Sequence, residues 1–482
     1  MLFNSLDFAI FLPIVFFLYW FVANENLRLQ NLLVVLASYT FYGWWDLRFL
    51  CLIVFSTIVD YSLGRLLHKE ESQTKRKVYL WLSIVINLGF LGFFKYYNFF
   101  LDNFVAAFSL FGTEIKANSL NIILPVGISF YTFQTLSYTI DVYNRRLEPT
   151  KDLLSFSAFV SFFPQLVAGP IERATNLLPQ FFKERTFNYS KAIDGLRQIL
   201  WGLFKKIVIA DNAAKVVNEI YSNSESYGGS TLALGAIFFA FQVYGDFSGY
   251  SDIAIGTARL FGFNLMQNFA FPYFSRNVAE FWRRWHISLT TWFRDYLYIP
   301  LGGGRGGLLM KIRNTSLIFI VSGFWHGANW TYLIFGALNG LYFLPILLRK
   351  KKRNYTTIIA EGKNLPSFRE LMQALGTFGL LVFSFIFFRS ENIMHAFSIL
   401  NTIFSSSFFA PPDFTGQKHA FISAVLIVVF MTLEWIGRNN QFAIEKIGFA
   451  WKRPYRHALY YSIIVAIFLF MGKQEQFIYF QF

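Results

Sequence analysis

Long apolar runs separated by short polar, often cationic, segments extend along almost the whole chain. A transmembrane helix needs about 20 mostly apolar residues, and the spacing of the runs predicts such helices throughout the sequence, several of them tilted or partial. We therefore expect an all-α polytopic membrane protein with roughly ten to twelve crossings. The runs that predict these helices cover residues 8–22, 32–45, 47–63, 78–94, 99–111, 317–348, 372–388, 420–436 and 459–471, and another run starts near residue 232.

Polar residues interrupt three of the segments between or within these runs. Residues 123–143 and 162–173 contain proline, glycine and polar side chains, and such sequences are tolerated at membrane depth only where protein or water satisfies the polar groups. We expect both segments to be inward-facing or re-entrant and to line a cavity. In residues 244–256, Asp246 and Asp252 are acidic groups at the same expected depth. The alternative for this third segment is a helix end at the membrane interface, capped by the aspartates.

The composition agrees with a membrane protein. Of the 482 residues, 55% are hydrophobic, 21% are aromatic and 15% are charged, which argues against two or three soluble domains. The formal net charge of +15 comes from short basic clusters between apolar runs, a distribution typical of cytoplasmic loops rather than of a nucleic-acid-binding domain. We expect residues 1–482 to form a single integral membrane domain. Basic residues before the last apolar run place its tail, residues 474–482, on the outer side.

Cysteine and histidine usage limits the chemistry further. The single cysteine, Cys51, excludes an intrachain disulfide, and no cysteine and histidine cluster has zinc-ligand spacing. We therefore expect no metal site and no bound cofactor.

Two segments carry the candidate chemistry. FWRRWHISLTTWFRDYLYIPLGGG, residues 281–304, contains three arginines, a histidine and an aspartate, and SGFWHGANW places His326 within an apolar run. Ionisable groups at membrane depth cost on the order of 2.5–3.5 kcal/mol each on insertion scales, so they indicate a functional cavity by default. A neutral imidazole can accept a proton from a hydroxyl that attacks an acyl carbon, and we interpret His326 as this general base. The alternative is a histidine that only hydrogen-bonds a neighbouring helix.

The second histidine and the arginines have two interpretations each. His286 could polarise a thioester carbonyl or orient an acyl donor, or it could be an interfacial residue. Four arginines are predicted to form a cationic rim that binds phosphate groups through bidentate hydrogen bonds, as in coenzyme A, and lipid headgroups are the alternative partner. These arginines are Arg283, Arg284, Arg294 and Arg305.

The segments FWRRWHISLTTWFRDYLYIPLGG, FWHGANW, DFSGYSDIAIG and FFPQLVAGPIER resemble the membrane-bound O-acyltransferase family, in particular its bacterial alginate O-acetylation branch. The resemblance implies a helical bundle with re-entrant segments around a transmembrane tunnel, with His326 at mid-depth and His286 as the branch's second histidine. It also implies an acyl donor on the cytoplasmic side, acetyl-CoA or another acyl thioester. An extracytoplasmic, SGNH-hydrolase-like partner usually completes the transfer to a glycan hydroxyl.

The carboxyl-terminal sequence FIYF resembles the tyrosine motif that a small separate subunit carries in teichoic acid D-alanylation systems of the same superfamily. A phenol is a plausible transient acyl acceptor because it is a better leaving group than an aliphatic alcohol. We therefore name Tyr479 as a candidate acyl relay. An aromatic anchor at the membrane interface is the alternative.

These observations together predict an O-acyltransferase of the bacterial cytoplasmic (inner) membrane. We expect it to pass an acyl group, expected to be acetyl, towards hydroxyls of an exported polysaccharide such as an alginate-like exopolysaccharide or peptidoglycan. A lipid or protein acceptor would be chemically close. The rival is a polysaccharide or lipid transporter or flippase without acyl transfer, which would predict paired inverted repeats with interrupted helices. The sequence shows no such repeat.

Overall fold

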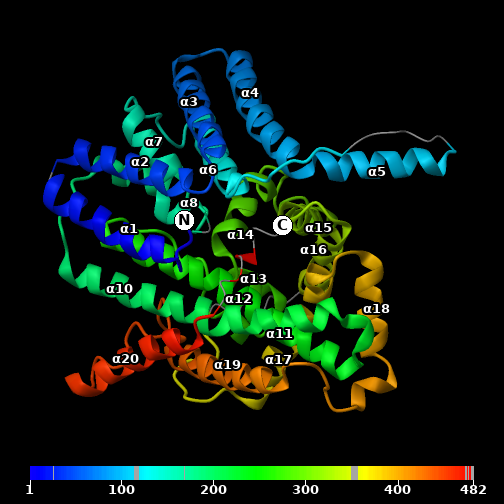
Figure 1. The fold of residues 1–482 in the computed structure, drawn as a ribbon. Coiled ribbons are helices and arrows are strands. Elements are labelled where there is room, and N and C mark those ends of the chain that lie inside the picture. Colours follow the sequence, from blue (N-terminus) through cyan, green and yellow to red (C-terminus); the bar gives the residue numbers. More distant parts are fainter. Residues whose placement is uncertain are drawn as a thin grey trace. The chain divides into compact units, whose positions relative to one another are not determined.

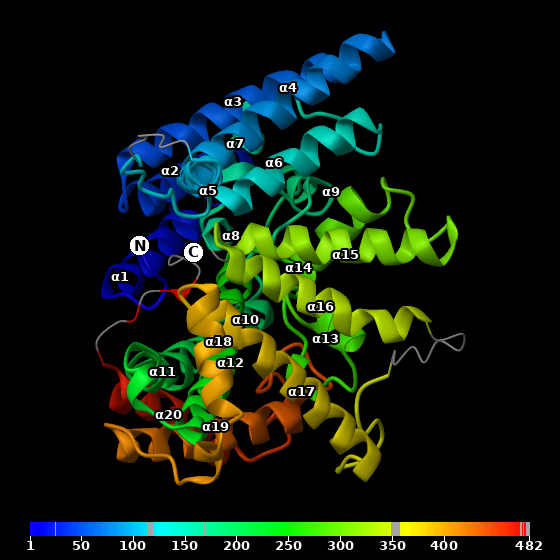
Figure 2. The same cartoon turned by 90° about the vertical axis from the view of Figure 1, so that its right-hand side faces the viewer.

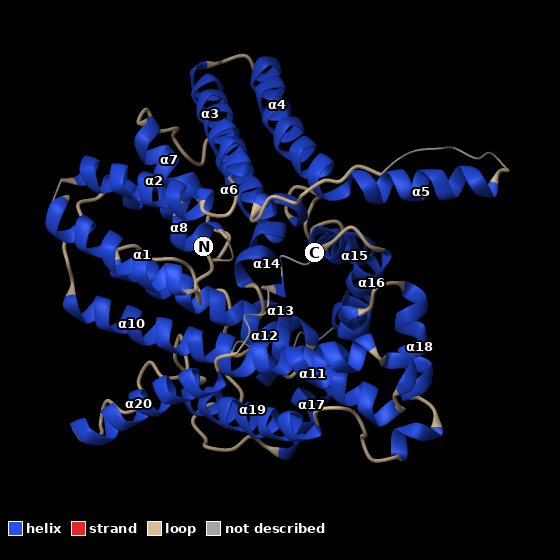
Figure 3. Cartoon of the chain, viewed as in Figure 1, coloured by secondary structure: helices blue, strands red, loops and turns tan. Residues whose placement is uncertain are grey.

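The computed structural model describes residues 1–24, 26–112, 119–167, 169–348, 357–472, 475 and 477–478. Within these residues the secondary structure consists of helices and loops, with no strand (Figure 3). The prediction of an all-α membrane protein is therefore confirmed. The predicted outer tail, residues 474–482, and the basic cluster at residues 349–353 lie mainly or wholly outside the described residues.

The chain divides into two compact units, which are described separately. The first comprises Met1–Ile193 and Thr257–Met266, and the second comprises Asp194–Gly256 and Gln267–Phe482. Helices of the first unit follow the blue-to-cyan part of the chain in Figure 1. They are α1 (Leu6–Phe17), η1 (Leu18–Val22), α2 (Leu27–Gly43), α3 (Leu47–Lys69), α4 (Gln73–Leu91), η2 (Gly92–Tyr96), α5 (Tyr97–Leu110), α6 (Ile128–Tyr143), α7 (Leu153–Ser161), α8 (Phe163–Leu166), α9 (Ala174–Leu177) and η3 (Leu178–Phe182).

Two helices, α10 (Tyr189–Leu203) and α12 (Gly229–Leu260), have residues in both units. The remaining helices belong to the second unit. They are η4 (Phe204–Ala210), α11 (Asp211–Ser222), η5 (Ser224–Ser226), η6 (Pro272–Phe274), α13 (Val278–Arg284), α14 (Ile287–Phe293), η7 (Arg294–Tyr298), α15 (Gly307–His326), α16 (Trp330–Leu348), α17 (Phe368–Arg389), α18 (Ile393–Ile403), η8 (Ser406–Phe409), α19 (Gln417–Gly437) and α20 (Arg453–Phe470).

Seven helices among the described residues are long and apolar enough to cross a membrane, fewer than the ten to twelve crossings predicted. Three further apolar helices are shorter, and α2, with 17 residues, is also short. The seven long helices are Leu47–Lys69, Gln73–Leu110, Gly229–Leu260, Gly307–His326, Trp330–Leu348, Phe368–Arg389 and Gln417–Gly437, and the three shorter ones are Leu6–Val22, Leu153–Leu166 and Ile393–Ile403.

The first unit buries a polar network where α3, α4 and α6 pack together. Asp60 of α3 is fully buried and accepts hydrogen bonds from Ser83 Oγ at 2.6 Å and Asn87 Nδ2 at 3.0 Å, both on α4. Thr139 Oγ1 of α6 donates to the same carboxylate at 3.2 Å. The polar residues of segment 123–143 are thus inward-facing, as predicted, but most of the segment forms the regular helix α6, whose polar groups are satisfied by neighbouring helices.

In the second unit, α12 is a mostly buried helix that packs closely against α10 and η4. A Cβ atom on Gly202 would lie 2.6 Å from the carbonyl oxygen of Gly249, and one on Gly249 would lie 2.8 Å from that of Gly202. Glycine at both positions lets the two backbones approach to a distance that any side chain would prevent. This contact fixes the position of the polar face of α12, which carries Asp246 and Asp252.

Asp246 and Asp252 lie in the interior of α12 and not at a helix end, so the interpretation as interfacial capping residues is wrong. Both side chains are buried. Lys206 Nζ lies 2.8 Å from Asp246 Oδ1, and Lys205 Nζ lies 2.5 Å from Asp252 Oδ2. The carboxylates can remain inside the unit because each one faces a lysine on η4.

Candidate active site

His326 is the last residue of α15, a helix that packs along α16 (Figure 2). The close approach of the two helices depends on Gly323, because a Cβ atom there would lie 2.1 Å from the carbonyl oxygen of Tyr332. The His326 side chain is buried, with 4% of its surface exposed. Its ring meets Phe388 of α17 edge to face, with ring centroids 5.3 Å apart. The segment HGANW therefore forms a tight turn between two apolar helices and places the imidazole in an aromatic environment.

His286 lies between the short helices α13 and α14 in an unusual backbone conformation. Its φ and ψ are 44° and 54°, the left-handed region that residues other than glycine seldom adopt. The side chain is 1% exposed. The ring packs edge-on against Phe247 of α12, with centroids 4.6 Å apart. Backbone strain of this kind persists where surrounding contacts fix the residue and is concentrated at functional sites.

Asn268 fixes the orientation of the His286 ring. Its Oδ1 accepts a hydrogen bond from the backbone N–H of Ser288 at 3.2 Å and from Ser288 Oγ at 2.8 Å. The same oxygen lies 3.2 Å from His286 Nδ1. Since a backbone N–H can only donate, this atom of Asn268 is the carbonyl oxygen, and His286 Nδ1 must carry a proton towards it. Nε2 is then the nitrogen that can accept a proton in the neutral imidazole.

Trp325 brings the two histidines into one aromatic enclosure. Its ring lies 5.1 Å from that of His326 and 5.9 Å from that of His286, centroid to centroid. Both histidines predicted from the sequence are therefore part of one buried site in the second unit. Asn268 was not predicted, because it follows α12 in an irregular segment that has no periodicity and no motif.

Three of the four arginines of the predicted cationic rim are exposed, and the fourth is half-buried. Arg283, Arg294 and Arg305 have exposed side chains, and Arg294 Nε donates to its neighbour Asp295 at 2.7 Å. Arg284 is half-buried, and its Nη2 lies 3.0 Å from Glu280 Oε1. Arg284 thus contributes to the internal structure, whereas the other three are accessible to an anionic ligand.

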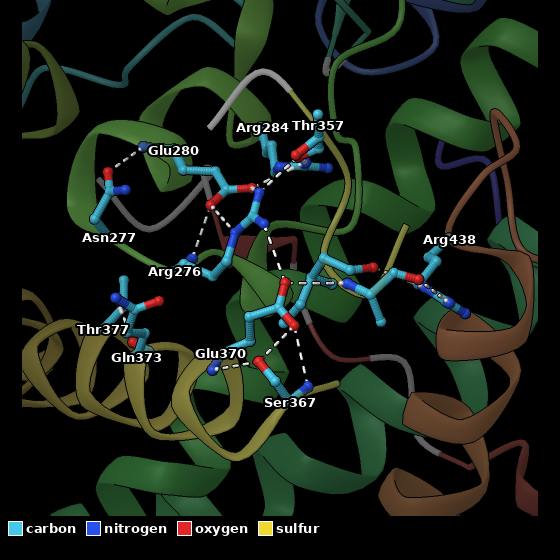
Figure 4. Close-up of polar contacts among 12 residues, drawn as sticks. Arg276, Asn277, Glu280, Arg284, Thr357, Ser367, Glu370, Gln373, Thr377 and Arg438 are labelled. Carbon is cyan, nitrogen blue, oxygen red and sulfur yellow. Dashed lines mark hydrogen bonds and ion pairs between the residues drawn. The ribbon is translucent and has the colours of Figure 1, made fainter. Parts of the chain in front are cut away.

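Glu280 belongs to an ion-pair network that the sequence analysis missed (Figure 4). Arg276 Nε lies 3.0 Å from Glu280 Oε2, and Arg276 Nη1 lies 3.3 Å from Glu370 Oε1 at the start of α17. Arg276 Nη2 also donates to the carbonyl oxygen of Thr357 at 2.6 Å. The spacing of four residues between Arg276, Glu280 and Arg284 is the sequence signal that could have indicated these pairs. The network joins α13, which precedes His286, to α17.

The carboxyl-terminal residues that precede the candidate relay are buried. Phe477 is 0% exposed and Ile478 is 2% exposed. Phe477 packs against Phe247, which itself contacts the His286 ring, with centroids 6.0 Å and 4.6 Å apart, respectively. Tyr479 lies outside the described residues.

Comparison with known proteins gives consistent results. Residues 38–351 match the membrane-bound O-acyltransferase family, MBOAT. The chain is 37% identical to a probable alginate O-acetylase AlgI of Pseudomonas putida over 502 residues, covering 100% of both chains. It is 32% identical to a peptidoglycan O-acetyltransferase of Helicobacter pylori, covering 100% of this chain and 98% of the relative. A teichoic acid D-alanyltransferase of Streptococcus thermophilus is 29% identical, covering 60% of this chain and 75% of the relative.

Proposed function

Because the chain belongs to the membrane-bound O-acyltransferase family, we propose that it takes an acetyl group from a cytoplasmic thioester and passes it across the membrane to hydroxyls of an exported polysaccharide. The observation that carries this proposal is the pair of buried histidines, His286 and His326, that share Trp325 in one enclosure. A water-poor aromatic site favours acyl transfer to a bound hydroxyl over hydrolysis of the donor.

In the proposed reaction, the oxygen of an acceptor hydroxyl attacks the thioester carbonyl carbon while His326 removes the hydroxyl proton. The carbon–sulfur bond breaks as the carbon–oxygen bond forms, and the thiolate leaves with the proton returned by the imidazolium. His286 is the supporting group. With Nδ1–H donated to Asn268 Oδ1, Nε2 is the nitrogen that would orient the reacting hydroxyl or share its proton.

Tyr479 is the first acceptor in this proposal, so a phenyl ester would form before the acyl group reaches the polysaccharide. The burial of Phe477 and Ile478 and the contact of Phe477 with Phe247 support this role, because Phe247 also contacts the His286 ring. An extracytoplasmic, SGNH-hydrolase-like protein would then move the acyl group from the phenol to the sugar hydroxyl.

The donor is proposed to be acetyl-CoA, with its phosphates bound by Arg283, Arg294 and Arg305, whose side chains are exposed. In this proposal the three arginines face the cytoplasm, where basic residues of membrane proteins are enriched. The names of two relatives, alginate O-acetylase and peptidoglycan O-acetyltransferase, support a polysaccharide acceptor and an acetyl group. The proposed compartment is the bacterial cytoplasmic membrane, which lies between a cytoplasmic donor and an exported acceptor.

The test is ester-linked acetate on purified surface polysaccharide from a deletion strain complemented with the wild-type protein, His326→Ala or Tyr479→Phe. We expect acetate only with the wild-type protein, at equal amounts of each protein in the membrane. Full acetylation with His326→Ala would overturn the role of this histidine. Acetate that persists in the deletion strain would show that the protein serves another acceptor or transports a substrate without acyl transfer.

A further inference from the structure

A buried cluster of charged residues lies in the second unit, apart from the histidine enclosure. Lys206 Nζ lies 2.8 Å from Asp211 Oδ1 and 2.8 Å from Asp246 Oδ1. The relative exposure of the Lys206 side chain is 1%. A buried charge of this kind costs several kcal/mol unless hydrogen bonds satisfy it, so each donor and acceptor of the cluster needs a partner.

The carboxyl-terminal segment supplies two of those partners through its backbone. The N–H of Ile478 donates to Asp246 Oδ2 at 2.7 Å, and the carbonyl oxygen of Glu475 accepts from Lys206 Nζ at 3.3 Å. The three donors of the Lys206 ammonium are then shared among Asp211, Asp246 and Glu475. The second oxygen of Asp246 is directed to the tail. The cluster is therefore completed by main-chain groups of the last residues of the chain.

Apolar contacts hold the same segment in place. Phe477 packs on Tyr250 of α12 with ring centroids 4.2 Å apart, and its side chain is fully buried. At the end of α20, Asn212 Nδ2 donates to the carbonyl oxygen of Phe470 at 3.4 Å. The described residues Glu475, Phe477 and Ile478 thus make both polar and aromatic contacts with α12 and η4.

We propose that Lys206, Asp211 and Asp246 form a docking site for the chain's own carboxyl-terminal segment, and that Asp246 is a positioning residue for Tyr479. The occupant is the peptide that includes Glu475, Phe477 and Ile478, which supplies a backbone carbonyl oxygen, a phenylalanine ring on Tyr250 and a backbone N–H, respectively. Its significance for acyl transfer depends on the proposed function, since Tyr479 directly follows Ile478 in the sequence and Phe247 connects Phe477 to His286 by ring contacts. Docking itself is independent of that function.

The experiment measures the accessibility of the tail in the full-length protein. A cysteine in place of Ile478 retains the backbone N–H, and Cys51→Ser removes the native thiol, so the Cys51→Ser, Ile478→Cys protein carries a single buried reporter. Labelling by a maleimide is followed in native membranes. We expect slow labelling of this parent protein and labelling at least about tenfold faster after Asp246→Ala, because a charge-assisted hydrogen bond to the tail is lost.

Asp252 provides a matched control on the same helix. It is a buried aspartate paired with a neighbouring lysine, Lys205, and its other oxygen accepts from Gln198 Nε2 at 2.8 Å. Asp252→Ala therefore removes a comparable ion pair without touching the tail, and we expect a labelling rate within about twofold of the parent. Equal acceleration by the two alanine variants, or no acceleration by Asp246→Ala, would overturn the docking site.

Two further variants separate docking from general damage. Asp246→Asn retains an acceptor for the Ile478 N–H, so we expect a labelling rate between those of the parent and the alanine variant.

Phe477→Ala leaves the charged cluster untouched and should also accelerate labelling, which tests docking even if Asp246→Ala prevents assembly. Polysaccharide acetate is measured on the same strains with Ile478 retained. A released tail with undiminished acetylation would leave docking intact but would overturn the positioning role of Asp246.

Discussion

Asn268 Oδ1 and His286 Nδ1 lie 3.2 Å apart, and this contact favours the tautomer of the imidazole that carries its proton on Nδ1. The assignment is secure because the same oxygen accepts the backbone N–H of Ser288. The residue that sets the chemistry of His286 therefore comes from a loop 18 residues earlier in the chain.

We predict that Asn268→Ala lowers the rate of acyl transfer by about tenfold to a hundredfold, because the His286 ring loses its tautomer and its orientation. Ser251→Ala is the matched variant. Ser251 Oγ accepts a hydrogen bond from Asn268 Nδ2 at 3.0 Å, so this variant removes a contact of the Asn268 amide nitrogen and leaves the contact of Asn268 Oδ1 with His286 in place. We expect this variant to cost less than Asn268→Ala. The measurement is the initial rate of acetate transfer in membranes, normalised to protein amount. Equal losses in the two variants would indicate a general packing defect.

The shared enclosure predicts that the effects of the two histidines are not additive. We expect His326→Ala to lower acyl transfer by about 10²–10⁴-fold, the usual contribution of a general base. The double variant with His286→Ala should lose little more than the more impaired single variant, because both groups serve one step. Rates from the two single variants and the double variant test this directly. Multiplicative losses would assign the histidines to separate steps.

The close packing of α15 against α16 predicts that the addition of one methyl group at Gly323 lowers stability. Gly323→Ala would place a methyl group 2.1 Å from the Tyr332 carbonyl oxygen, and we expect a loss of roughly 1–3 kcal/mol of stability as the helices are forced apart. Gly376→Ala on α17 is the control, because no atom lies within 4 Å of the added Cβ. Thermal unfolding in detergent should show a lower midpoint for Gly323→Ala and an unchanged or higher one for Gly376→Ala. The opposite order would contradict the helix contact.

The ion-pair network of Figure 4 predicts that breaking a buried ion pair lowers stability more than breaking an exposed one. Arg276 and Arg284 both pair with the Glu280 carboxylate, and Glu280→Gln removes its charge. We expect a stability loss of about 3–5 kcal/mol, typical of a broken buried pair. Arg294→Gln removes an exposed pair with Asp295, for which about 0–1 kcal/mol is expected. Chemical unfolding of the two variants in detergent tests the comparison. Similar stabilities would show that solvent screens the Glu280 pairs.

The sequence was sufficient to predict the helical class and the polar character of α12, because apolar runs and the acidic residues within them are local signals. It also named both histidines, which the structure brings into one enclosure and whose catalytic roles stay a prediction. It was not sufficient to predict which residues these side chains contact. The pairing of Lys206 with Asp246 joins residues 40 positions apart, and no periodicity connects them. The number of crossings stays a prediction, because seven helices among the described residues are long and apolar enough to span a membrane and several other predicted runs correspond to shorter helices. Four arginines were predicted to form one rim, whereas Arg284 pairs with Glu280, and the sequence alone does not reveal that pair.

The buried pairs of Lys205 and Lys206 with Asp252 and Asp246 also constrain how the protein is made. On its own, α12 would carry two carboxylates into the lipid, at roughly 2.5–3.5 kcal/mol each on insertion scales. Their lysine partners lie on η4, which precedes α12 and therefore leaves the ribosome first. The partners that neutralise the two carboxylates are therefore synthesised before the helix that needs them, and we expect charge reversal at Lys205 or Lys206 to lower the amount of protein integrated into the membrane.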